Sequence, residues 1–181
     1  MAVVGTASRP TSYWWSESSP NQYAEKVTIP SNGNIVSLGQ WMCGQDGTAR
    51  TKLCVWNGST GALLGQSAQF TAADGGSQSS SAMSLYVEAL TAPLAVTAGQ
   101  VVYVGLAHHP SDRILISGGR GTSDTHYTQN QASWPGSMTA SPSSMSRRIG
   151  SYVADFEPGS PPPTTDNGVY IYRAGAWLQI A

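Results

Sequence analysis

Apolar residues recur along this chain in short runs, separated by segments rich in Gly, Pro, Asn, Asp and Ser. Helical periodicity is almost absent, and the runs are rich in β-branched and aromatic residues, which favour strands. Short strands at such regular spacing are typical of a sandwich or barrel. The predicted strand segments are KVTI (26–29), NIVSLGQWMCG (34–44), TKLCVW (51–56), ALLGQSAQF (62–70), MSLYVEAL (83–90), VVYVGLA (101–107), RILISGG (113–119) and RIGSYVADF (148–156).

Two regions interrupt this rhythm. Residues 118–147 are poor in aliphatic side chains and predict a long loop, of the kind that is often functional or mobile. Residues 157–168 contain three consecutive prolines, which favour an extended spacer. The chain therefore divides into an N-terminal arm (1–19), an antiparallel, jelly-roll-like β-sandwich (20–156), a Pro-rich spacer (157–168) and a C-terminal β-hairpin (169–181).

The two cysteines flank the polar stretch GQDGTAR. A turn between Thr48 and Ala49 would place Cys43 opposite Cys54. The same register would place Trp41 opposite Trp56 and Met42 opposite Val55, and these matched pairs favour a hairpin. Two free, buried thiols are favoured over a cross-strand disulfide, because we expect synthesis in the cytosol.

Charge and composition narrow the function. Charged residues make up 10% of the chain, and the formal net charge is −1. The largest basic cluster is the pair Arg147-Arg148, which argues against a nucleic-acid partner. We expect no membrane insertion, because apolar stretches fall short of the roughly 18 residues that a membrane helix needs. The start MAVVGTASRP lacks the basic and apolar regions of a secretory signal.

Catalytic chemistry has little support in the sequence. The carboxylates are scattered, and Glu88 and Asp155 are most simply explained as solvated strand residues. A metal site of His108, His109, Asp112 and His126 is disfavoured, because adjacent histidines on a strand point to opposite faces. The run SGGRGTSD lacks the context of a phosphate loop and predicts a flexible loop tip. We therefore expect a non-enzymatic protein without cofactor or metal; a hydrolase is the weakest reading.

The long loop contains candidate sugar-binding residues, since aromatic and amide side chains are common in sugar sites of sandwich domains. An exposed Trp134 beside Pro135 would stack on a pyranose ring. The alternative, which we favour, is that Tyr127 and Trp134 hold the loop against the sandwich. The candidate residues are His126, Tyr127, Gln129, Asn130, Gln131 and Trp134.

The C-terminal hairpin is predicted from two apolar segments around Arg173-Ala174-Gly175. An isolated two-stranded hairpin is marginally stable in water, so it needs a surface to lie against. That surface is either its own sandwich or, as the stiff spacer favours, a neighbouring subunit or larger assembly shell to whose exposed sheet edge it adds strands. The expected interface residues are Tyr170, Tyr172, Trp177 and Leu178, with Trp14 and Trp15 either a matching arm or a closure of the sandwich end.

Several segments resemble the carbohydrate-binding-module-like jelly-roll domains of tailed-bacteriophage structural proteins. They are TAPLAVTAGQVVYVGLA (91–107) followed by DRILISGG, the SWPGSMT segment (133–139), and a terminal GVYIYRAGAWLQIA that is similar to the closing hairpin of phage minor tail proteins. The resemblance covers most of positions 34–181. It implies a virion component without an active site, assembled in the host cytoplasm.

The sequence and the resemblance together predict a bacteriophage virion structural protein, a minor tail or accessory protein that forms homo-oligomers. Its expected partners are copies of itself and other virion proteins. Two alternatives stay open. One is a carbohydrate-binding module that attaches to host-surface glycan, and the other is a capsid decoration protein.

Overall fold

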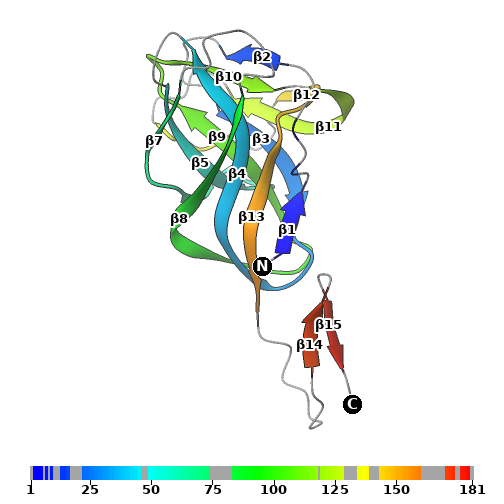
Figure 1. The fold of residues 1–181 in the computed structure, drawn as a ribbon. Helices are drawn as coiled ribbons and strands as arrows, with labels where there is room; N and C mark the ends of the chain where they lie inside the picture. Colours follow the sequence, from blue (N-terminus) through cyan, green and yellow to red (C-terminus); the bar gives the residue numbers. More distant parts are fainter. Residues whose placement is uncertain are drawn as a thin grey trace.

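The computed structural model describes residues 2–5, 7, 9, 13–16, 22–45, 49–73, 83–117, 119–128, 134–138, 143–159, 170–173 and 176–179. In these residues the chain forms two antiparallel sheets packed face to face, and a separate hairpin (Figure 1). The predicted all-β sandwich with a C-terminal hairpin is thus confirmed. No helix in the described part of the chain is long and apolar enough to cross a membrane.

The first sheet has the strand order β1–β13–β4–β10–β2, with β8 also paired to β4. Its strands are β1 (Ala2–Gly5), β2 (Tyr13–Ser16), β4 (Gly33–Gln45), β8 (Ser84–Val96), β10 (Arg113–Ser117) and β13 (Ser151–Pro158). The second sheet has the order β12–β11–β3–β9–β5–β6, with β7 also paired to β5. Its strands are β3 (Gln22–Thr28), β5 (Ala49–Asn57), β6 (Leu63–Gln66), β7 (Phe70–Ala72), β9 (Val101–His108), β11 (Gly119–Thr128) and β12 (Ser143–Arg148).

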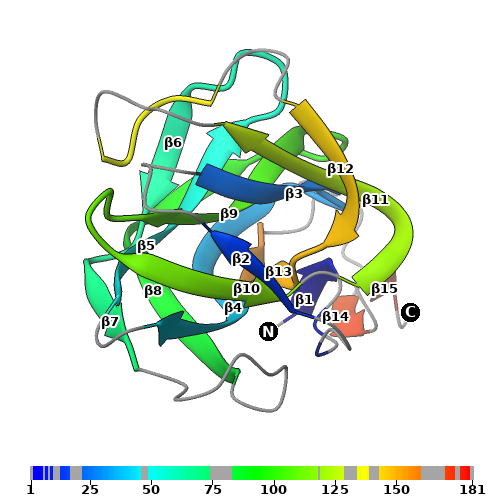
Figure 2. The same ribbon diagram turned by 90° about the horizontal axis from the view of Figure 1, so that it is seen from above.

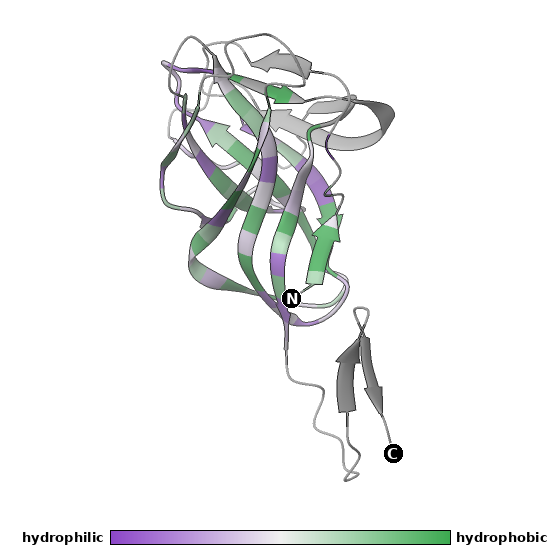
Figure 3. Ribbon diagram, viewed as in Figure 1, coloured by the Kyte–Doolittle hydropathy of each residue, from purple (hydrophilic) through white to green (hydrophobic). Residues whose placement is uncertain are grey.

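The chain crosses repeatedly between the two sheets, as in a jelly roll: β3, β5 and β9 lie in the second sheet, and β4, β8 and β10 in the first. Side chains of a strand alternate between the core and the outer face except at bulges, and Figure 3 shows apolar and polar residues mixed along β4 and β13. The core between the sheets includes Ile35 and Leu38 from β4, Leu53 from β5, Leu106 from β9 and Phe156 from β13, all at most 1% exposed.

The predicted hairpin between Cys43 and Cys54 is wrong. Cys43 lies in the first sheet opposite Leu115, whereas Cys54 lies in the second sheet opposite Gly105 and Gln66. The physical reason is that β4 already has partners on both sides, with β8 along one edge and β13 and β10 along the other, so no edge remains for β5. Both thiols are buried and form no disulfide, and burial raises the pKa of Cys54.

The predicted loop over 118–147 is also wrong in part, because it contains β11 and β12. β11 has a polar sequence, GRGTSDTHYT, without the alternation that indicates a strand. It forms a strand because β3 pairs with one of its edges and β12 with the other. Tertiary pairing thus overrides a weak local preference, and the predicted flexible loop tip in SGGRGTSD falls partly in this strand.

The N-terminal segment predicted as an arm contributes two strands to the first sheet. β1 pairs with β13, and β2 pairs with β10 so that Trp14 lies opposite Ile116 and Trp15 opposite Leu115. Both tryptophans therefore belong to a strand of the chain's own sandwich.

The C-terminal hairpin consists of β14 (Tyr170–Arg173) and β15 (Ala176–Gln179), which pair with each other and with neither sheet of the sandwich. Figure 1 shows it beyond the end of β13, outside the sandwich. Cross-strand partners and alternate residues share a face of a hairpin. Tyr170, Tyr172, Trp177 and Gln179 thus occupy one face, and Ile171, Arg173, Ala176 and Leu178 the other.

Candidate functional sites

Residues 134–138, hereafter the strap, lie across the outer face of the second sheet. Figure 2 shows this segment in yellow beside β5 and β6. The Gly136 carbonyl accepts hydrogen bonds from Nε1 of Trp56 at 2.9 Å and from Nε2 of Gln22 at 3.0 Å. The Met138 amide donates to the carbonyl of Gly61 at 2.8 Å. Three separate contacts therefore fix the strap to β3, β5 and the turn after β5.

The strap closes a second hydrophobic cluster on this outer face. The cluster consists of Ala24, Cys54, Trp56, Tyr103, Ala107 and Met138, with Leu63 and Trp134 at its border. Fully burying a large apolar side chain contributes roughly 1.5–3 kcal/mol. This explains why β9 is buried along both faces from Val102 to His108, with the main core below it and the strap cluster above.

Trp134 has the contacts of an anchor. Its Nε1 donates to the Ala107 carbonyl at 3.2 Å, and the ammonium of Lys52 lies over its ring, 5.2 Å from the centroid. The His109 ring meets it edge-on, with centroids 5.0 Å apart. A ring that stacks on a sugar needs an open face, and Lys52 already covers one face of this half-buried ring. The described contacts of Trp134 are those of a residue that holds its segment against the sandwich.

Of the other predicted sugar-binding residues, the structure describes the strand positions of His126 and Tyr127, both in β11. His126 pairs with Ala24, whose side chain lies in the outer cluster, whereas Tyr127 pairs with Tyr23, which faces the main core. Because paired residues share a face, positions 126 and 127 lie on opposite sides of the second sheet. Gln129, Asn130 and Gln131 lie outside the described residues.

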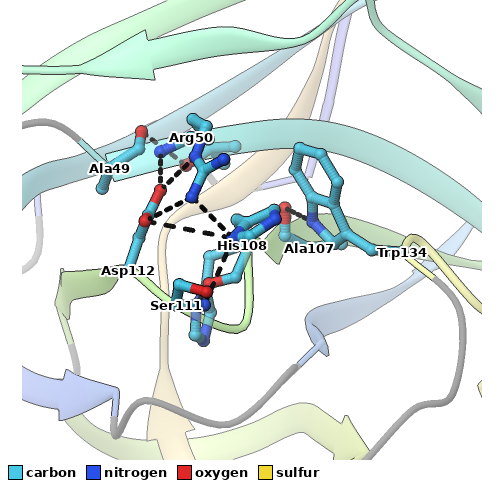
Figure 4. Close-up of polar contacts among 9 residues, drawn as sticks. Ala49, Arg50, Ala107, His108, Ser111, Asp112 and Trp134 are labelled. Atoms are coloured by element: carbon cyan, nitrogen blue, oxygen red, sulfur yellow. Dashed lines mark hydrogen bonds and ion pairs between the residues drawn. The ribbon is translucent and has the colours of Figure 1, made fainter.

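Next to Trp134, an ion pair joins the start of β5 to the turn between β9 and β10 (Figure 4). Arg50 donates from Nε to Oδ2 of Asp112 and from Nη2 to Oδ1, both at 2.9 Å, and its backbone amide donates to Oδ2 at 2.7 Å. The hydrogen bond from the Arg50 side chain, above all, lowers the pKa of Asp112. Both carboxylate oxygens are thus engaged, which makes the pair a structural clamp.

Two histidines adjoin this clamp. The Nδ1 atom of His109 receives hydrogen bonds from Nη2 of Arg50 at 2.9 Å and from the Ser111 amide at 3.2 Å, which assigns its proton to Nε2. His108 is fully buried and contacts the His109 carbonyl through Nδ1, and burial lowers its pKa. Among the described residues, no group of three or more His, Cys, Asp or Glu side chains is placed to hold a metal ion.

Glu88 and Asp155 do not face one another. Asp155 accepts a hydrogen bond from Ser37 at 3.0 Å, whereas Glu88 pairs with Leu38, the next residue of β4, which points into the core. The two carboxylates therefore lie on opposite faces of the first sheet, and they cannot flank a single glycosidic bond.

The outer face of the first sheet carries exposed apolar residues, a feature that the sequence analysis missed. Leu85 is 40% exposed and Val87 49% exposed, both on β8. Leu85 pairs with Trp41, and Val87 pairs with Gly39, on which the Tyr152 ring lies. The alternation in MSLYVEAL predicts that β8 has two different faces, but only the sheet order shows which face lies outside.

Fold and sites define an all-β sandwich with a strap on one sheet, an apolar outer face on the other, and a hairpin that belongs to neither. The comparisons with known proteins add no relative: no family model, no curated protein and no solved structure matches the chain.

Proposed function

We propose that this protein is a non-enzymatic structural component of a bacteriophage virion, a minor tail or accessory protein that assembles through its C-terminal hairpin. The single observation that carries the proposal is that β14 and β15 pair with each other and with neither sheet of the sandwich. A two-stranded sheet alone is marginally stable in water, so this hairpin requires a further surface.

The two faces of the hairpin support an intermolecular role. One face holds Tyr170, Tyr172 and Trp177, and the other holds Ile171, Ala176 and Leu178. A hairpin that lies flat on a single surface covers only one of its faces. A hairpin that lies between two subunits has both faces covered, and one that extends the sheet of another subunit gains backbone hydrogen bonds along its edge. The resemblance to phage minor tail proteins supports the virion as the assembly in question.

The experiment compares the solution mass of the full chain with that of a chain ending at Gly159, by light scattering. Truncation at Gly159 keeps all of β13 and the hydrogen bond from the Gly159 amide to the Asn32 carbonyl. We expect the full chain to form an oligomer and the truncated chain to be a folded monomer. The same oligomeric state for both chains would contradict assembly through the hairpin.

The virion part of the proposal has its own test. An antibody against the sandwich should label intact phage particles in electron micrographs, and mass spectrometry of purified particles should detect the chain. Absence of the chain from purified particles would overturn the proposal that it is a virion protein, whatever the oligomeric state of the isolated chain.

A further inference from the structure

We propose that the outer edge of β8, from Ser84 to Ala89, accepts the C-terminal hairpin of a second copy of this chain. This inference rests on the proposed function and names the partner surface for it. The edge would be extended by strand addition, with backbone hydrogen bonds between β8 of one copy and β14 or β15 of the other.

β8 is an edge strand in the described part of the first sheet. It pairs with β4 along one side, with continuous register from Ser37↔Ala89 to Met42↔Ser84. Its other side is bridged once, by Ser67 at Leu90. Between Ser84 and Ala89 the strand contains no proline, no lysine and no register shift. Of the features that protect natural edges from further pairing, this range holds one charged residue, the half-buried Glu88.

The apolar residues of β8 match a hairpin with two apolar faces. Outward, Leu85 and Val87 are two of the three large apolar side chains that are exposed among the described residues. Inward, Tyr86 and Leu94 of β8 are only partly buried against the core, as are Leu64 and Phe70 on the facing sheet. A strand added at this edge would continue both faces, because side chains alternate across a sheet.

The edge of this sheet at β1 fits less well. β1 is four residues long, and its pairing with β13 has a register shift between Ala2 and Val4. Such irregularities bend an edge and discourage further pairing. Its exposed Val3, at 55%, therefore serves as a matched control for Val87.

The C-terminal hairpin is tethered closely enough to reach the β8 edge of its own sandwich. Residues 160–169 are ten in number and span at most about 35 Å. The body of the sandwich ends at Pro158, which pairs with Gly33 of β4, and Ala89 of β8 pairs with Ser37, four positions further along β4. The distance from Pro158 to Ala89 is therefore about 13 Å along the sheet and about 10 Å, or two strand spacings, across it. The hairpin pairs with neither sheet of its own sandwich, so among the described residues the hairpin strands and the β8 edge both stay available to a second copy.

The first arm of the test introduces a charge beside each edge in the full chain. We expect Val87→Lys to weaken self-association roughly tenfold or more, and Val3→Lys to leave the oligomer mass unchanged. Equal thermal melting of the two variants shows that both remain folded. If Val87→Lys keeps the full oligomer while truncation at Gly159 abolishes it, the hairpin assembles elsewhere. The inference then fails and the proposed function stands.

The second arm uses disulfide formation between copies that carry tags of different size. One copy carries Val87→Cys, and the other carries either Leu178→Cys or Trp177→Cys, because these two positions lie on opposite faces of the hairpin. We expect a mixed dimer with one of the two, and none when Val3→Cys replaces Val87→Cys. No mixed dimer with either position would overturn the proposal.

Discussion

Trp56 and Gly136 are joined by a hydrogen bond of 2.9 Å, from the indole Nε1 to the carbonyl oxygen. The bond connects the centre of the second sheet to the strap, 80 positions later in the chain. Trp56 is fully buried, so the indole N–H needs a protein partner there. The strap supplies that partner and covers the ring at the same time.

The Trp56→Phe variant should therefore loosen the strap. We expect the free energy of unfolding to fall by about 1–2 kcal/mol, from the lost hydrogen bond and the smaller ring. Hydrogen exchange of the Met138 amide, which donates to Gly61, should accelerate. Trp41→Phe is the control, since Trp41 also donates to a carbonyl, that of Ala7, but is only half-buried. An equal effect of the two substitutions would contradict the role of the strap.

The clamp between Arg50 and Asp112 predicts a stability change in acid. The folded-state pKa of Asp112 lies below its ordinary value of 3.8. The clamp therefore stabilises the fold fully above about pH 4, and this contribution is lost as the pH falls through the lowered pKa. Asp112→Asn should reduce the unfolding free energy by about 1–2 kcal/mol at pH 7, and by less at pH 3, in urea titrations.

The variant Arg50→Met tests the same clamp from the other side. It should also flatten the dependence of stability on pH below 4. A wild-type slope that persists in both variants would assign the acid sensitivity to other carboxylates.

Buried His108 predicts a second pH range in which the free energy of unfolding changes. Burial lowers its pKa below the ordinary 6.5, so the unfolded chain takes up the proton more readily than the folded chain. The unfolding free energy should fall as the pH decreases below about 6.5. His108→Asn keeps a donor near the His109 carbonyl and removes the titration, so its stability should change less between pH 7 and 5. The same slope in wild type and variant would contradict the assignment.

Gly105 permits the close pairing of β9 with β3. A Cβ at this position would lie 1.8 Å from the Tyr23 carbonyl oxygen, a backbone atom with little freedom to move. Gly105→Ala should lower the unfolding free energy by about 3 kcal/mol or more, measured by denaturant titration. At Gly65 the nearest atom is Cδ1 of Leu90 at 3.5 Å, so Gly65→Ala should change stability by less than about 1 kcal/mol. Similar losses at both sites would show that the close strand approach is not the cause.

Much of the fold followed from local patterns. The period-2 alternation and turn residues located most strands of both sheets, because strand formation there agrees with residue preference and burial. The C-terminal hairpin was predicted over 169–181, and its strands lie at Tyr170–Arg173 and Ala176–Gln179. The signal was two apolar segments separated by a glycine-containing stretch. The polar strand β11 was missed because its pairing comes from β3 and β12.

The sequence by itself determined the all-β class, the strand positions with an apolar alternation, and a terminal hairpin that needs a partner surface. Tertiary structure decided which strands pair, and so placed Cys43 and Cys54 in different sheets, His126 and Tyr127 on opposite faces, and Trp134 under Lys52. The physical reason is that alternation fixes which residues share a face of a strand. The competition among strands for a limited number of edges then fixes which face is buried, and against what.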